Sequence, residues 1–431
     1  MNSRYNIYFK TDSDKYLVYN TLSDAIIRID GCTKRILNHG EFNQLDNDTL
    51  EKLYQNGFLV DIDDRIIFRS LINKWKHQNN TYLFKIIFTH KCNMACKYCY
   101  QGSGEVLTDS MDQDTLECVI KFIKKKSAGC RILKIALYGG EPFLEKEKIL
   151  YLLDDLNEYC CKENKYLEIS GSTNGSILGE DLIIKLKKYP IDSLQITFAG
   201  NRVDHDTRRI FKDATGSYDK LIGVLNNLEL YKIKYHVRVD VDKENFPGIG
   251  ELLDDLKEKI GRPPQLSIQK IIYDPVFNKD LPSRILEMSD EHLHELYTLA
   301  TLKGYDVKPK QLGNIKAGCG AIYENAFAID PHGDVYKCAA VAGILDQRLG
   351  CIDCNGNLTK INQEIYYKWL LRNPLQFEEC FDCEFAPICF AGCSFQAYAQ
   401  FGDIDHPICH KDQYMSNIET NLRISYPAMW L

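Results

Sequence analysis

The sequence lacks several features that would place the protein in a membrane or on nucleic acid. It has no run of about 20 apolar residues, so no segment is predicted to span a membrane. The opening residues, MNSRYNIYFK, do not form an apolar signal segment, and we expect a cytoplasmic protein. A formal net charge of -7 gives no support for a surface that binds nucleic acid or anionic lipid. Low-complexity segments and internal repeats are also missing.

Cysteine is abundant by contrast, with 17 residues in a chain of 431. In a reducing compartment this number favours metal ligation over disulfide bonds, and an odd count also fits poorly with complete pairing. The chain is long enough for two or three domains with a sizeable core. The spacing of the cysteines is therefore the first guide to function.

Three cysteines lie close together in the segment Thr89–Gln101, which reads THKCNMACKYCYQ. Cys92, Cys96 and Cys99 have the spacing C-x3-C-x2-C. Three thiolates do not complete a tetrahedral zinc site. They can hold three irons of a four-iron, four-sulfur (4Fe-4S) cluster and leave the fourth iron open. A zinc knuckle without its fourth ligand and three ordinary buried thiols are the alternatives.

This spacing, with the aromatic Tyr98 before the last cysteine, resembles that of the radical SAM enzymes. The resemblance implies that the open iron binds S-adenosylmethionine (SAM) through its amino and carboxylate groups. It also implies that SAM is cleaved to a 5'-deoxyadenosyl radical, which removes a hydrogen atom from an unactivated carbon.

Residues 80–280 alternate short apolar runs with amphipathic stretches such as that of Leu116, Val119, Ile120 and Ile123. Spacings of three and four place each apolar set on one helix face, and repeated strand–helix units imply a parallel sheet with right-handed crossovers. Six such units match the partial (β/α)6 barrel of radical SAM enzymes. The cysteine loop follows the first strand, at the end where such barrels keep their chemistry. The predicted strands are Leu83–Phe88, Leu133–Tyr138, Leu167–Ser170, Ser193–Phe198, Tyr235–Val241 and Gln265–Ile271.

The second predicted strand ends in a turn that reads YGGEP. Glycines allow a ligand to approach the backbone closely, and a neighbouring carboxylate can bind an ammonium group. The turn resembles the GGEP motif of the family, which implies contact with the SAM amino group. The residues concerned are Tyr138, Gly139, Gly140 and Glu141.

Four polar residues on the next strands are further candidates for SAM contacts: Ser172, Asn174, Thr197 and Arg238. Ser172 and Asn174 fall where the family commonly binds the ribose hydroxyls. Capping or buried, satisfied polar groups are the alternative reading. The sequence departs from the family pattern after the fourth strand, where related chains often carry an aspartate and this chain reads Phe198–Gly200.

Residues 1–79 are predicted to form a winged-helix-like α+β module, with a polar linker over Asn73–Asn80. Its strands are expected at Tyr5–Phe9, Tyr16–Asn20 and Ala25–Asp30, and its helices at Gly31–Leu37 and Asn47–Asn56. The module has no basic stripe, which argues against DNA binding. It resembles the PqqD-like element that recognises leader peptides in enzymes that modify ribosomal peptides. That resemblance implies that a leader adds as an extra strand to a sheet edge. A stabilising appendage is the alternative.

Residues 316–431 form the second cysteine-rich region, which a bridging segment, residues 281–315, joins to the core. Six cysteines and a glycine fit C-x13-G-x4-C and C-x2-C-x5-C-x3-C, and a seventh cysteine follows. The pattern resembles the SPASM extension of radical SAM enzymes, which binds two auxiliary 4Fe-4S clusters. Spacing alone is also compatible with two zinc sites.

The resemblance assigns Cys380, Cys383, Cys389 and Cys409 to the outer auxiliary cluster. It assigns Cys319, Cys338 and Cys393 to the inner auxiliary cluster, which then lacks a fourth cysteine. Cys351 and Cys354 form an extra C-x2-C pair. They are candidates for the missing ligand, for substrate binding, or for ordinary thiols.

The complete pattern predicts a radical SAM peptide maturase with SAM and three 4Fe-4S clusters. Its expected partners are a ribosomal precursor peptide and an electron donor such as flavodoxin or ferredoxin. An open inner iron favours cysteine-to-carbon thioether formation, as in sactipeptide and ranthipeptide enzymes. The alternatives are carbon–carbon or carbon–oxygen crosslinking, sulfatase-type oxidation and a metal-bound regulator. Sulfatase-maturing relatives carry an aspartate base where this chain has Ala339, so no catalytic base is identified.

Overall fold

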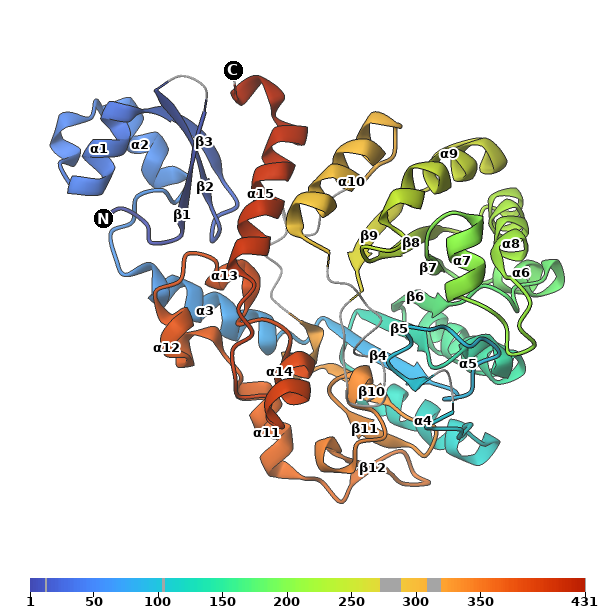
Figure 1. Cartoon of the computed structure of the whole chain (residues 1–431). Helices are drawn as coiled ribbons and strands as arrows, with labels where there is room; N and C mark the ends of the chain where they lie inside the picture. Colours follow the sequence, from blue (N-terminus) through green and yellow to red (C-terminus); the bar gives the residue numbers. More distant parts are fainter. Residues whose placement is uncertain (12–13, 103–104, 272–287, 308–318, 431) are drawn as a thin grey trace. The chain divides into compact units, whose positions relative to one another are not determined.

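The computed structural model describes residues 1–11, 14–102, 105–271, 288–307 and 319–430 (Figure 1). The chain divides into two compact units. The first unit joins Met1–His77 to a short segment that ends at Glu324 and to Leu370–Leu431. The second, the barrel unit, contains Gln78–Val307 and Asn325–Trp369. The segment after Asn325 therefore packs with the barrel, although the sequence grouped it with the C-terminal cysteines.

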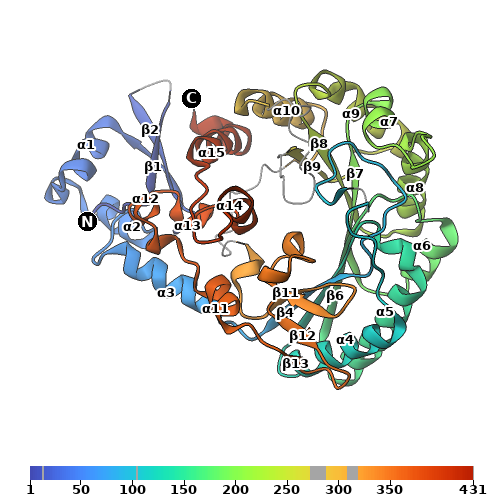
Figure 2. The ribbon, with the colours of Figure 1, turned by 60° about the horizontal axis from the view of Figure 1, so that its bottom comes forward.

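Six parallel strands form the centre of the barrel unit, and all six were predicted from the apolar runs. They pair in chain order from β4 to β9. Helices cover the outer face of this curved sheet (Figure 2). The strands are β4 (Thr81–Ile87), β5 (Ile132–Tyr138), β6 (Tyr166–Thr173), β7 (Ile191–Phe198), β8 (Tyr235–Val241) and β9 (Leu266–Lys270). The helices are α4 (Gln113–Lys126), α5 (Lys146–Lys162), α6 (Glu180–Leu186), α7 (Arg202–Arg208), α8 (Tyr218–Tyr231), α9 (Ile249–Ile260) and α10 (Asp290–Leu302).

Helix α4 shows why these segments fold as they do. The Asp112 side chain accepts a hydrogen bond from Thr115 N and caps the first turn, and lysines occupy the last turn. Leu116 and Val119, together with their neighbours at helical spacing, are completely buried against the sheet. The predicted apolar face is therefore the face that packs on the barrel.

The sheet continues beyond β4 into four short strands from the second half of the chain. Strand β10 (Ala326–Ile329) pairs in parallel with β4, and three antiparallel strands follow it outward. Pairing with β10 protects the backbone groups of β4 that would otherwise lie at a free sheet edge. The outer strands are β11 (Asp334–Tyr336), β12 (Gly350–Ile352) and β13 (Leu358–Thr359). Strands this short carry no periodic signal, which is why the sequence did not reveal them.

The first unit contains the predicted N-terminal module. Its three strands and first two helices lie where the sequence placed them: β1 (Asn6–Lys10), β2 (Lys15–Asn20), β3 (Ile26–Asp30), α1 (Gly31–His39) and α2 (Asn47–Gln55). The prediction of a linker from Asn73 was wrong, because α3 (Asp64–Lys76) extends through the first half of it. Asp63 caps this helix, and Phe68 and Ile72, one turn apart, are buried.

Both faces of the three-stranded sheet are covered within the first unit. One face packs against α1 and α2 through residues that include Val18 and Leu37. The other face carries Ile7 and Leu17, which pack against the C-terminal segment. That segment contributes Phe385, Ile418, Leu422 and Trp430. Its helices are α12 (Glu378–Phe381), α13 (Ala386–Cys389), α14 (Ser394–Phe401) and α15 (Lys411–Ser425), and α11 (Gln363–Leu371) precedes them. No helix in the described part of the chain is long and apolar enough to cross a membrane.

Candidate active site

A cavity of about 230 Å³ opens at the carboxyl ends of the barrel strands. Its lining contains nearly all the residues that the sequence proposed for the core cluster and SAM. They are Cys92, Cys96, Cys99, Tyr138, Gly139, Gly140, Ser172, Asn174, Thr197 and Arg238. The topology brings them together, because parallel strands present their carboxyl ends at one edge of the sheet.

The three core cysteines come from one loop after β4. Ala95 N donates to Ile210 O at 2.8 Å and Lys97 N donates to Arg208 O at 3.0 Å, so the loop is fixed against the segment after α7. Burial raises the pKa of Cys92 to about 12. Thiols in this environment stay protonated at neutral pH unless a metal deprotonates them.

The donor set fits an iron–sulfur cluster better than a single ion. The three thiols share one cavity, and Met94 N lies 3.5 Å from Cys92 Sγ, a contact of the kind that tunes cluster sulfurs. No three His, Cys, Asp or Glu side chains among the described residues are arranged to hold one metal ion. The cavity thus brings the three predicted cluster ligands together, and metal analysis separates the iron–sulfur and zinc readings.

The two glycines of the GGEP turn permit a close backbone contact with the cysteine loop. Gly139 has a φ of 145°, and a Cβ at this position would lie 2.3 Å from Thr89 O. A Cβ on Gly140 would lie 2.4 Å from the carbonyl oxygens of His90 and Lys91. The turn thus holds the start of the cysteine loop, and any side chain at these positions would push the loop away.

Glu141 is not among the residues that line the cavity, and its contact with the SAM amino group stays a prediction. Its carboxylate is completely buried and accepts hydrogen bonds from Phe143 N at 3.0 Å, Asn174 N at 2.7 Å and Thr173 Oγ1. Burial raises the pKa of Glu141 to about 7, although these donors act in the opposite direction. Glu141 therefore joins the turn after β5 to the end of β6, and the backbone of the glycines faces the cavity.

Two charged residues that the sequence did not suggest line the same cavity, Arg209 and Asp240. Arg209 is buried, donates to Tyr98 Oη at 3.2 Å, and its Nε has no hydrogen-bond partner. Asp240 is also buried and accepts from Arg238 Nε at 2.6 Å. A buried guanidinium with a spare donor suits a carboxylate ligand. Neither residue belongs to a periodic or motif pattern, so no sequence signal was available.

A pair of tyrosines, Tyr100 and Tyr138, lies between the cavity and Cys338, which belongs to the same barrel unit. Tyr100, directly after Cys99, has its hydroxyl 3.0 Å from that of Tyr138. Burial raises the pKa of Tyr100, and the neighbouring charges include those of Cys99 and Cys338. The predicted inner ligand Cys338 therefore lies near the core site.

The four predicted outer ligands lie near one another in the first unit. Burial raises the pKa of Cys380 to about 12, and the charges of Cys389, Cys383 and Cys409 add to the effect. Cys389 accepts backbone hydrogen bonds from Gly392 and from the residue after Cys409. Such N–H···S bonds are typical of thiolates that hold iron–sulfur clusters.

Two of the predicted inner ligands, Cys393 and Cys319, also belong to the first unit and interact electrostatically. The extra pair, Cys351 and Cys354, lies on the barrel unit. Cys351 Sγ is 3.4 Å from Thr359 Oγ1, and Cys354 O accepts from Lys121 Nζ at 3.0 Å. These contacts place the pair in and after β12, next to α4.

Comparison with known proteins adds the decisive observation. Residues 86–256 match the model of the Radical SAM superfamily. The chain belongs to the radical SAM superfamily. The matched region runs from β4 to α9 and therefore contains the cysteine loop, the GGEP turn and Arg209.

Three similar proteins match this radical SAM enzyme over more of the chain than residues 86–256. The radical SAM cyclopropyl synthase TigE of Paramaledivibacter caminithermalis is 21% identical over 93% of this chain and 91% of its own length. Among solved structures, anSMEcpe with bound AdoMet covers 81% of this chain and 98% of its own, at 16% identity and a TM-score of 0.62. Streptococcus suis SuiB bound to the precursor peptide SuiA covers 95% and 99%, at 14% identity and a TM-score of 0.55. At these identities the structures support the fold.

Proposed function

We propose that this protein modifies a ribosomally made precursor peptide by radical SAM chemistry and joins a cysteine sulfur to a carbon of that peptide. The observation that carries the proposal is the single cavity shared by three core cysteines, the GGEP turn and Arg209. When bound, the core cluster and SAM supply a 5'-deoxyadenosyl radical that takes a hydrogen atom from an unactivated carbon.

The cavity residues have complementary tasks toward SAM. Arg209 offers its charge to the SAM carboxylate, while the backbone of Gly139 and Gly140 accommodates the amino group. Ser172 and Thr197 offer hydroxyls to the ribose.

The residue after Cys338 distinguishes between possible reactions. Ala339 is 4% exposed and has no acid–base function, so the aspartate base expected of a sulfatase-maturing oxidase is missing. A substrate thiol that binds iron needs no such base, because a metal deprotonates a coordinating thiol. This supports thioether formation. The likeness to a cyclopropyl synthase favours carbon–carbon bond formation as the second candidate.

Mass spectrometry of the modified precursor separates these candidates. We expect each crosslink to remove a pair of hydrogens and to protect one cysteine from alkylation by iodoacetamide. A carbon–carbon link removes the same mass but leaves every cysteine open to alkylation. The control is precursor incubated with enzyme but without SAM. Loss of hydrogen with full alkylation would replace the thioether assignment by the second candidate.

The N-terminal module offers a sheet edge for the leader of the precursor. Within the described residues, β3 has β2 as its one strand neighbour. Gly31 N donates to Asp14 O and Asn20 N donates to Ala25 O at the two ends of this pair. Because hydrogen-bonded pairs alternate along an antiparallel ladder, the N–H of Arg28 points away from β2. A leader strand can accept from it.

Proline at position 28 tests this edge. Arg28→Pro removes one outward donor but no hydrogen bond between β2 and β3, and edge strands tolerate proline. We expect precursor affinity to fall about fivefold, as for one lost hydrogen bond of about 1 kcal/mol. Arg28→Ala, which keeps the donor, should bind almost normally, and both variants should cleave SAM normally without peptide. Equal affinities for the two variants would exclude strand addition at β3.

A further inference from the structure

Two basic side chains of the first unit are buried without a carboxylate partner. Lys76, the last residue of α3, is 4% exposed, and Arg372, just beyond α11, is 2% exposed. Lys76 Nζ donates to the carbonyl oxygens of Leu370 at 2.8 Å and Arg372 at 2.6 Å. Arg372 donates only to backbone carbonyls, those of Ile404, Phe390, Ala391 and His406. In the described part of the chain neither cation forms an ion pair.

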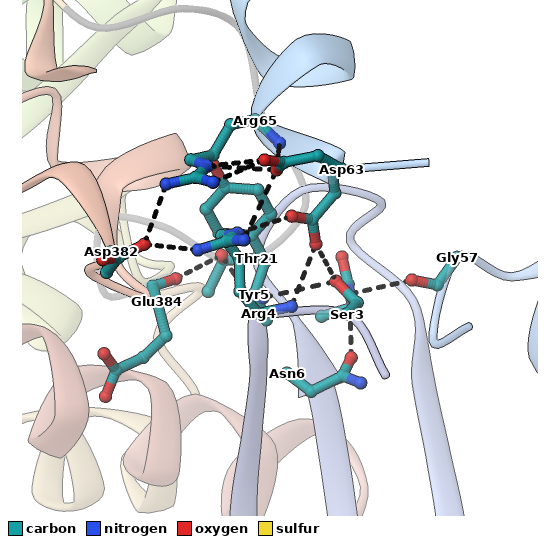
Figure 3. Close-up of polar contacts among 12 residues, drawn as sticks. Ser3, Arg4, Tyr5, Asn6, Thr21, Gly57, Asp63, Arg65, Asp382 and Glu384 are labelled. Atoms are coloured by element: carbon teal, nitrogen blue, oxygen red, sulfur yellow. Dashed lines mark hydrogen bonds and ion pairs between the residues drawn. The ribbon is translucent and has the colours of Figure 1, made fainter. Parts of the chain in front are cut away.

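Two half-buried arginines of the same unit, Arg4 and Arg65, are by contrast neutralised by carboxylates. Figure 3 shows Arg4 and Arg65 surrounded by carboxylates. Arg4 Nε donates to Asp64 at 2.8 Å, and Arg65 pairs with Asp63 at 2.5 Å. Burying a charge without compensation is costly. The contrast indicates that Arg372 faces negative charge of another kind. Lys76 lies beside Arg372, and burial together with the charge of Arg372 lowers the pKa of Lys76 to about 8.

The negative groups around Arg372 are chiefly the predicted cluster ligands. Burial lowers its pKa, and the charges that oppose this effect come from Cys393, Asp405, Cys380 and Cys389. Thiolates that hold iron give the site a net negative charge, which the free thiols lack. The missing counter-charge is therefore supplied when the auxiliary site is filled.

Arg372 also fixes the backbone between Cys389, a predicted outer ligand, and Cys393, a predicted inner ligand. Phe390, Ala391 and Gly392 have positive φ values of 54°, 60° and 75°. Arg372 donates to the carbonyl oxygens of Phe390 and Ala391, each at 3.0 Å. The N–H groups of this turn are used within the segment, since Phe390 N donates to Ala386 O at 3.1 Å and Gly392 N donates to Cys389 O at 3.0 Å. A Cβ on Gly392 would lie 2.2 Å from Ile408 O, so the turn requires glycine there.

We infer that Lys76 and Arg372 are positioning residues that balance the charge of the auxiliary cluster held by Cys380, Cys383, Cys389 and Cys409, and that they raise its reduction potential. The inference rests on the proposed function, because it requires an iron–sulfur cluster at these cysteines. It also gives α3 of the N-terminal module an electrostatic task at the auxiliary site, in addition to any role in peptide binding.

The test is the midpoint potential of the auxiliary clusters in the full chain carrying Cys96→Ala, followed by electron paramagnetic resonance. Lys76→Gln keeps donors for the same carbonyls but removes the charge. We estimate the effect for a unit charge that acts over roughly 10 Å at an effective dielectric constant of about 20. Loss of this charge should shift the redox equilibrium about tenfold toward the oxidised cluster, which corresponds to a midpoint potential about 59 mV lower. Lys76→Arg should restore the original potential.

The exposed Lys74, two residues earlier on α3, provides the matched control. Lys74→Gln removes the same charge from the same helix and should leave the potential unchanged. An unchanged potential in Lys76→Gln at full iron content would overturn the inference. Equal loss of iron from Lys76→Gln and Lys76→Arg would also overturn it, since it would indicate a purely structural role. Iron confined to the core site in the unmodified chain would refute the auxiliary cluster itself.

Discussion

Cys96→Ala is expected to abolish the formation of 5'-deoxyadenosine from SAM. Cys96 lines the cavity with Cys92 and Cys99, and two thiolates cannot hold the three irons that leave one iron open for SAM. Iron should fall from about twelve to about eight per chain if three clusters are present, with sulfide in parallel. The measurement is chromatography of the nucleoside product, combined with iron and sulfide analysis of protein prepared without oxygen.

Cys161→Ala is the matched control for this prediction. Cys161 is an exposed cysteine on α5, and it lies outside the cavity lining. The control should keep its iron and its SAM cleavage. Undiminished 5'-deoxyadenosine production by Cys96→Ala would contradict the assignment of the core site. About four irons in the unmodified protein would confine iron to the core and reassign the C-terminal cysteines.

Deletion of residues 1–77 is expected to cause aggregation and, if the predicted outer auxiliary cluster is present, to remove its iron. The module shares two hydrophobic clusters with the C-terminal segment, and Cys383 packs against both. Arg65 also donates to Asp382, next to that ligand, at 3.2 Å (Figure 3). Each large apolar side chain that the deletion exposes costs about 1.5–3 kcal/mol of stability. The cost summed over both clusters is comparable to the roughly 5–15 kcal/mol by which a typical domain is stable, so the C-terminal segment is not expected to stay folded.

Iron analysis and size-exclusion chromatography of the truncated chain measure this effect, and a pair of point variants on α3 refines it. Phe68 is completely buried, whereas Ile66 is 61% exposed. Phe68→Ala should cost about 3–5 kcal/mol of stability and destabilise iron binding, while Ile66→Ala should do neither. A monomeric truncated protein with full iron content would show that the module is dispensable for the C-terminal fold. Because truncation damages this fold, leader capture is better tested at Arg28.

The residues around the core site illustrate how much a linear sequence can specify. Cys92, Cys96 and Cys99 lie within one loop, so their spacing alone predicts that they hold the core cluster. The apolar periods of the barrel strands and helices are also local, because burial of one face repeats every two or every 3.6 residues. These patterns predicted the parallel barrel. They therefore also predicted that Ser172, Thr197 and Arg238 come together at the carboxyl edge of its sheet.

The roles proposed for Arg209, Lys76 and Arg372, and the buried hydrogen bonds of Glu141, became visible only in the tertiary structure. The sequence places Glu141 beside the SAM turn, but its orientation depends on donors from the next strand, Thr173 and Asn174. The sequence also contains the basic residues without indicating which of them become buried, since burial depends on segments that are far apart in the chain. For the same reason the packing of the N-terminal module on the C-terminal cysteines was invisible. Local spacing thus determined the chemistry of this protein, whereas long-range packing determined which charges act on it.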